Sequence, residues 1–228
     1  MDSFRQAFEL LFSLDKELIQ ILFTTLRMSL FSTGISCVLG LPLGTLIGIK
    51  NFRGKPTIKK IIHTLMGLPP VAAGLLVYAM FTHYGPFGKL NLLFTVTVMV
   101  IAQCILITPV VIGLSASITE KSASDVIETG IGMNLKKSTI LRLCIKENKN
   151  SLFSVVLNAF GRSIAEVGAV SLVGGNIQWK TRVMTTAILL ETNKGNFSFA
   201  LSLGIILLLI ALIVNIAASF IVKENDDG

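Results

Sequence analysis

Charged residues are scarce in this sequence. Only 14% of its 228 residues are Asp, Glu, Lys or Arg, whereas 52% are hydrophobic. An ordinary soluble domain carries about 25% charged residues, so roughly half of the polar surface that a water-soluble fold needs is missing. The apolar residues also occur in long runs, which favours a lipid bilayer as the surrounding medium. The composition therefore indicates an integral membrane protein.

Cysteine and histidine are also rare, with three and two copies. Cys37, Cys104 and Cys144 show neither a pairing pattern nor the spacing of metal ligands, and free cysteine packs as a small hydrophobic residue. His63 and His83 lie far apart in the sequence, and neither has a group of carboxylates beside it. We therefore expect no metal site and no cofactor.

Several functional signatures are absent. There is no Walker A motif, so we do not expect the chain itself to bind and hydrolyse ATP in the P-loop manner. No cluster of nucleophile, metal ligands and acid–base groups is present, so we expect no catalytic residues. The net charge is +7, but the cations are not interleaved with aromatic residues, which argues against nucleic-acid binding. No internal repeat is visible, which argues against an inverted-repeat secondary transporter.

Five segments are long and apolar enough to span a bilayer, which takes about 20 residues. They are approximately 18–49, 61–81, 92–118, 152–173 and 197–222, which predicts an all-α membrane protein. Pro69-Pro70 is expected to kink the second segment. Segment 1–17 carries Phe4, Phe8, Leu11 and Phe12 at helical spacing. This spacing favours a short helix at the membrane surface, and a frayed terminus is the alternative.

Lys and Arg flank the spans unevenly, which predicts the orientation of the chain. Twelve lie in the loops at 50–60 and 119–150 and at the C-terminus, and six lie on the opposite side. We therefore expect the N-terminus outside, and the C-terminus and both basic loops in the cytoplasm. An odd number of spans agrees with these opposite termini. Arg182 and Glu191 fall in the external region, where a solvated surface is expected.

The loop at about 119–150 is the largest expected cytoplasmic element, and its apolar residues recur at helical spacing. Gly130 and Gly132 interrupt it, which predicts two short helices around a glycine turn. A helix pair held at the membrane surface is suited to docking a partner. The alternative is a solvated amphipathic loop that binds nothing.

The fourth expected span contains two charges, Arg162 and Glu166. They are four residues apart, so on a helix they share one face and can pair. Each charge alone costs about 2.5–3.5 kcal/mol at the centre of a membrane helix, so the pair indicates a specific role. It is either a gating contact or pathway wall, or a static pair that joins neighbouring helices. Gly161 and Gly168 add small side chains that permit close helix packing.

The segment Gly161–Ile177, GRSIAEVGAVSLVGGNI, resembles the permease subunit of tungstate ABC importers and, more distantly, molybdate and sulfate permeases. Supporting matches are 181–188, Glu191-Thr192, 41–44 and 67–74. The resemblance covers nearly the whole chain from about residue 25. It implies the type I ABC importer permease fold over 18–228, in a multi-pass protein of a bacterial or archaeal cell membrane.

The resemblance also implies a function and partners. The chain would move a tetrahedral oxyanion, with tungstate expected first, into the cytoplasm by alternating access. Cytoplasmic ATPase subunits would hydrolyse the ATP, an extracytoplasmic binding protein would deliver the anion, and two permease copies would form a homodimer. Molybdate or sulfate is the alternative cargo. An ATP-independent carrier or channel is the alternative class.

Particular residues acquire roles from the resemblance. In this family the 119–150 loop docks the ATPase, and Ile131–Asn134 take the place of its Leu-Gly-Ala-Ser segment. Val126–Glu128 stand where the family has Glu-Ala-Ala, and no Leu-Pro follows near 144–147. The expected coupling residues are Glu128, Gly130, Gly132, Met133 and Asn134. The expected gating or pathway residues are Arg162, Ser163, Glu166 and Gly168.

Overall fold

The computed structural model describes residues 15–223, with their side chains except those of 124, 125, 131, 137, 141 and 221–223. Within this described part the regular structure is entirely helical, without a strand, which confirms the predicted all-α fold. The N-terminal segment expected at the membrane surface, with Phe4, Phe8, Leu11 and Phe12, lies outside the described residues.

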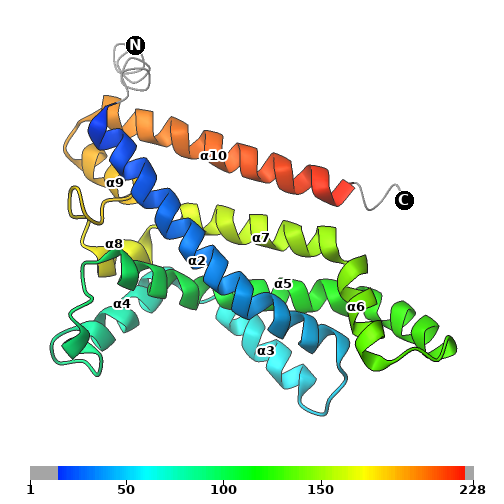
Figure 1. The fold of residues 1–228 in the computed structure, drawn as a ribbon. Helices are drawn as coiled ribbons and strands as arrows, with labels where there is room; N and C mark the ends of the chain where they lie inside the picture. Colours follow the sequence, from blue (N-terminus) through cyan, green and yellow to red (C-terminus); the bar gives the residue numbers. More distant parts are fainter. Residues whose placement is uncertain (1–14, 224–228) are drawn as a thin grey trace. The chain divides into compact units, whose positions relative to one another are not determined.

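The described elements follow one another in the order shown in Figure 1. They are α2 (Lys16–Ile49), α3 (Lys55–Met66), α4 (Pro70–Phe81), the 3-10 helix η1 (Gly88–Leu90), α5 (Val96–Gly132), α6 (Lys137–Glu147), α7 (Lys149–Ile164), α8 (Gly168–Gly174), α9 (Met184–Asn193) and α10 (Phe197–Lys223).

Three of these helices are long and apolar enough to cross a membrane: α2, α5 over Val96–Ala123, and α10 over Phe197–Phe220. Two further pairs, α3 with α4 and α7 with α8, meet the same criterion together but are bent at a short break. If each bent pair is one span, the described chain has five spans at the positions expected from the sequence. The fourth, however, is not the continuous helix that was expected.

The break between α3 and α4 follows from its two prolines. Gly67 ends α3, Pro69 has extended backbone angles, and Pro70 is the first residue of α4. A proline disfavours helical angles in the residue before it, and proline is well suited to the first helical position. The expected kink at Pro69-Pro70 is thus a complete interruption of the helix.

The described chain divides into two compact units, and α2, α5, α7 and α10 each contribute to both. One unit comprises 15–32, 69–105 and 160–213, and the other comprises 33–68, 106–159 and 214–223. One buried apolar cluster of the first unit consists of Leu18, Ile21, Ile164, Met184, Ala187 and Leu203. One buried apolar cluster of the second unit consists of Cys37, Ile107, Val111, Val155 and Ala159.

Large apolar side chains are exposed along the long helices. In α2, Phe23 is 64% and Val38 is 73% exposed, and in α10 Leu208 is 71% exposed. A water-soluble monomer rarely exposes apolar patches on this scale, whereas lipid tails solvate such side chains well. The distribution of apolar surface therefore agrees with residence in a membrane.

Candidate functional site

Helices α4 and α8 are short, and each follows a break in a membrane span. They belong to the same unit and pack directly against each other (Figure 1). A Cβ atom added to Gly74 would lie 2.6 Å from the Cα of Ala169, and one added to Gly168 would lie 2.8 Å from Cγ2 of Val71. Small residues allow helix backbones to approach this closely within a membrane. The two broken spans therefore meet at a contact that has no room for larger side chains.

The break between α7 and α8 bends the chain by 55° although it contains no proline. The Glu166 carboxylate accepts a hydrogen bond from the backbone N–H of Ala169 (3.2 Å), and the Glu166 carbonyl accepts one from the Thr185 hydroxyl (3.0 Å). Within a membrane, backbone groups released by a break need partners inside the protein. Glu166 therefore caps the start of α8, where the helix dipole favours a negative charge.

A buried polar cluster joins the end of α7 to α2 and α5. Gln103 Oε1 accepts hydrogen bonds from the hydroxyls of Ser32 (2.6 Å) and Ser163 (3.0 Å), and Gln103 Nε2 donates to the Ser163 carbonyl (2.8 Å). All three residues are completely buried. Hydrogen bonds between membrane helices contribute on average about 0.6 kcal/mol each and reach about 2 kcal/mol. The cluster therefore anchors α7 just before it ends.

The four expected gating residues occupy different environments. Arg162 is exposed in the last turn of α7, whereas Ser163 is buried in the polar cluster. Glu166 lies in the break, and Gly168 starts α8. The premise that Arg162 and Glu166 share a helical face is wrong, because α7 ends at Ile164, between them. Their role in gating stays a prediction.

Reasoning from the sequence missed Ser32, Gln103 and Thr185. A signal existed for Gln103, since it is the only amide side chain in the apolar run 92–118. An amide deep in a membrane span needs a hydrogen-bonding partner on a neighbouring helix. Nothing in the sequence distinguishes Thr185 from the threonine beside it.

The loop that follows α8 is tied down by its side chains. Gly175 and Asn176 adopt left-handed backbone angles, with φ of 67° and 49°. The Thr181 hydroxyl donates to the carbonyl of Gly174 (2.6 Å), and the Asn176 amide exchanges two hydrogen bonds with Thr186 (3.0 and 3.2 Å). These bonds give Asn176, Thr181 and Thr186 a structural role in holding the loop between α8 and α9.

Arg182 and Glu191 are buried, which corrects the expectation of a solvated surface. Arg182 is 8% exposed and donates to the Glu17 carboxylate at 2.7 Å. Glu191 is 7% exposed and accepts hydrogen bonds from Lys194 (2.8 Å) and Asn196 (3.0 Å). The bond from Lys194 is the main cause that holds the pKa of Glu191 below its ordinary value, against the opposing effect of burial.

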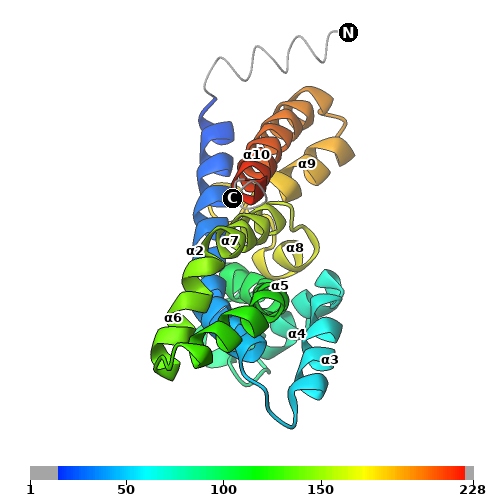
Figure 2. The same cartoon turned by 90° about the vertical axis from the view of Figure 1, so that its right-hand side faces the viewer.

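The 119–150 region forms a helix–turn–helix, but its first helix is not a separate element. Helix α5 continues through Gly130 and ends at Gly132, and α6 follows after a short turn. Asn134 in the turn has a φ of 53°, a conformation that asparagine tolerates better than most residues. Figure 2 shows α6 beside the end of α5.

Two contacts hold this helix pair together. A Cβ atom added to Gly130 would lie 2.7 Å from Cγ1 of Ile140, so α5 and α6 approach closely there. The Asn148 amide donates to the hydroxyl of Ser122 (2.6 Å), which ties the corner between α6 and α7 to α5. The region is therefore a packed structural element rather than a solvated loop.

The expected coupling residues divide into an exposed group and one packing residue. Glu128, Gly132, Met133 and Asn134 are exposed around the end of α5, whereas Gly130 is buried against α6. A Cβ atom added to Gly132 would meet nothing within 4 Å. A cavity of about 300 Å³ lies beside them. The exposed group is therefore available for contact with another protein.

The described chain has helices of membrane length, two broken spans and an exposed helix–turn–helix on the side rich in Lys and Arg. Together these features define a membrane-spanning transport subunit. The chain belongs to the family described as binding-protein-dependent transport system inner membrane component, whose model matches residues 40–225. It is therefore a membrane-spanning permease subunit of an ABC importer.

Individual relatives cover almost the whole chain. A tungstate uptake system permease protein from Peptoclostridium acidaminophilum is 39% identical over 94% of each chain. A protein of the same description from Campylobacter jejuni is 40% identical over 94% of this chain and 90% of its own. The sulfate transport system permease protein CysT of Escherichia coli is only 23% identical, over 83% of this chain and 71% of its own.

A solved structure confirms the fold independently of close sequence similarity. The inward-facing MetNI methionine ABC transporter matches with a TM-score of 0.67, over 92% of this chain and 96% of that one. The two sequences are only 15% identical, so this likeness concerns the fold alone. The expected importer permease fold is thereby confirmed.

Proposed function

We propose that this permease moves tungstate into the cytoplasm, together with ATPase subunits and an extracytoplasmic binding protein. The supporting observation is the identity of 39–40% over 94% of the chain to two tungstate uptake permeases, against 23% to a sulfate permease. Because molybdate and sulfate share the shape and charge of tungstate, they are the cargoes against which the proposal is tested.

The ATPase docks on the exposed end of α5 and the turn that follows it. Support comes from Glu128, Gly132, Met133 and Asn134, which are exposed together there. Gly130 has a different role in this proposal: it lets α6 pack closely on α5 and so holds the docking surface in shape. A rigid helix pair transmits movement of the ATPase to α5 more directly than a flexible loop would.

Two copies of the permease form a homodimer around the translocation pathway. Arg162 in the last turn of α7 is exposed, as are Ala165 and Val167 in the break that follows. A charged side chain within a membrane span faces the interior of a bundle or a water-filled cavity rather than lipid. A second copy opposite the break would provide such an environment, which supports the dimer.

The break between α7 and α8 is the moving part of the gate in this proposal. Glu166 and Thr185 connect the break to the segment before α9, and α8 packs tightly on α4. Interrupted helices can change their angle at the break without disturbing the hydrogen bonds inside each helix. Nucleotide binding by the ATPase would shift the population between inward-open and outward-open states.

Stimulated ATP hydrolysis tests the proposed cargo. The permease is reconstituted with its ATPase and binding protein, and hydrolysis is measured with tungstate, molybdate or sulfate. We expect the greatest stimulation at the lowest concentration with tungstate. Stimulation by sulfate at concentrations where tungstate has no effect would show that the cargo is wrong while leaving the importer role intact.

A further inference from the structure

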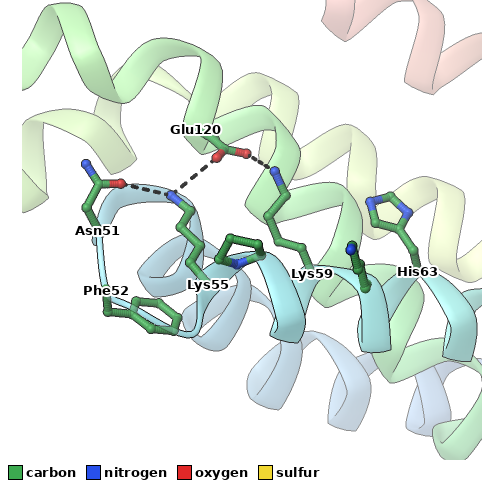
Figure 3. Close-up of a pocket in the computed structure, with 8 residues that line it drawn as sticks. Asn51, Phe52, Lys55, Lys59, His63 and Glu120 are labelled. Carbon is green, nitrogen blue, oxygen red and sulfur yellow. Dashed lines mark hydrogen bonds and ion pairs between the residues drawn. The ribbon is translucent and has the colours of Figure 1, made fainter.

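A cavity of about 510 Å³ lies between the loop after α2, helix α3 and helix α5, all within one unit (Figure 3). Its lining is mainly cationic, since Lys55, Lys59, Lys60 and His63 of α3 line it together with Glu120 of α5. Three ammonium groups and one carboxylate give this lining a formal charge of +2 when His63 is neutral. The charge excess favours an anionic ligand.

One side of the cavity is held in place by Glu120. The Lys55 ammonium is nearly buried and has three acceptors: the Gly48 carbonyl (2.8 Å), Asn51 Oδ1 (3.5 Å) and Glu120 Oε1 (3.3 Å). These acceptors use all three of its N–H groups. The Lys59 ammonium donates to Glu120 Oε2 at 2.6 Å. Glu120 therefore positions both ammonium groups, and its own charge is already compensated.

The remaining donors have no acceptor among the side chains that the structure describes. Lys59 retains two N–H groups after its bond to Glu120. Among residues 15–223, the side chains of Lys60 and His63 have no hydrogen-bonding or ion-pair partner. We propose that this cavity binds a tetrahedral oxyanion group of the phosphate class, through Lys59, Lys60 and His63. Such a group has enough oxygen atoms to accept from all three side chains.

The opposite face of α3 indicates where the cavity lies relative to the membrane. Ile58, Ile61 and Leu65 are exposed, and their spacing of three and four residues places them on one face of the helix. An exposed apolar face beside a basic face is typical of a helix at the membrane surface, so α3 is the surface end of the broken span that α4 continues. The bound oxyanion is therefore the phosphate of an anionic phospholipid or a free anion from the cytoplasm. This ligand is distinct from the cargo in the translocation pathway.

The full-length chain, purified in detergent, tests the proposal through its melting temperature in two series. One series compares phosphatidylglycerol with phosphatidylcholine in mixed micelles, and the other adds inorganic phosphate or tungstate at constant ionic strength. We expect a saturable rise in melting temperature in at least one series. Replacing Lys60 and His63 together by Gln should weaken the apparent affinity about tenfold or more, since charge-assisted hydrogen bonds are lost.

Lys121→Gln is the matched control, because Lys121 is an exposed cation next to Glu120 that does not line the cavity. It should keep the affinity of the unaltered chain, and Lys60→Arg should keep most of it. A response to phosphatidylglycerol alone identifies a lipid ligand, and a response to the free anions identifies a soluble one. The proposal is overturned if neither series saturates, or if the Lys60 and His63 double variant binds as well as Lys121→Gln.

Discussion

Gly74 of α4 lies so close to α8 that a Cβ atom added to it would come within 2.6 Å of the Cα of Ala169. The obstructing atom belongs to the backbone, so a rotamer change cannot relieve the clash, and one of the helices would have to move. Both helices follow breaks in membrane spans. This contact therefore helps to join the two interrupted spans.

Gly74→Ala should destabilise the protein by about 1–3 kcal/mol, the usual cost of overpacking a tight contact. The matched control is Gly34→Ala in α2, where an added Cβ atom meets nothing within 4 Å. Alanine is favoured over glycine inside a helix by about 0.5–1 kcal/mol, so the control should not be destabilised. Thermal unfolding in detergent measures both variants, and equal melting temperatures would contradict the close contact.

Glu166→Gln separates the charge of Glu166 from its role as a helix cap. Glutamine retains an oxygen that can accept from the Ala169 N–H, so the melting temperature should change little, whereas ATP-coupled uptake should fall about tenfold or more if the charge takes part in gating. Glu166→Ala should lower uptake and also remove a cap worth about 0.5–2 kcal/mol. If Glu166→Gln and Arg162→Gln both leave uptake intact, these charges do not form the gate.

Gly132→Trp should leave the fold intact, because the position is exposed and an added Cβ atom has no neighbour within 4 Å. The bulky side chain should nevertheless block docking, so co-purification of the ATPase and coupled uptake should both be lost. Gly54→Trp alters another exposed glycine, in the loop before α3, and should retain both. Unchanged ATPase binding and uptake in Gly132→Trp would count against the docking surface.

Glu191→Gln should lower the melting temperature at pH 7. Because the hydrogen bond from Lys194 lowers the pKa of Glu191 in the folded state, its stabilising contribution is complete above the unfolded value of about 4.3. This contribution is lost as the pH falls through the lower folded pKa. The difference between the unaltered chain and Glu191→Gln should therefore shrink in acid. Glu147→Gln, at an exposed position, is the control. A difference in melting temperature between the unaltered chain and Glu191→Gln that grows in acid would contradict this prediction.

The long spans could be predicted because run length and hydropathy are local properties of a sequence. The same holds for the interruption at Pro69-Pro70, which proline chemistry dictates. The break after Ile164 could not be predicted from local sequence. The backbone groups near it are hydrogen-bonded by the Glu166 side chain and by Thr185, which lies 19 positions after Glu166. The sequence did not reveal that α5 continues to Gly132. Polar residues and glycine occur in exposed stretches of a helix as well as at its end.

The candidate sites were predictable only where a residue is unusual in its own segment. Arg162 and Glu166 are charges in an apolar run, and their sequence positions alone draw attention to them. The partners of Ser163 are 60 and 131 positions away, at Gln103 and Ser32. Local pattern cannot reveal such pairings. Likewise, in the sequence the cations of α3 indicate only the orientation of the chain in the membrane. The structure adds that Glu120, 61 positions after Lys59, holds both Lys55 and Lys59.

Uptake of tungstate into proteoliposomes tests the central claim most directly. The vesicles contain this permease and its ATPase, with the binding protein on the side from which tungstate is offered and ATP on the other. We predict accumulation of tungstate that requires the binding protein, the ATPase and ATP together. Transport of tungstate by the permease alone, at the same rate without ATPase or ATP, would contradict its role as the membrane-spanning subunit of an ATP-driven importer.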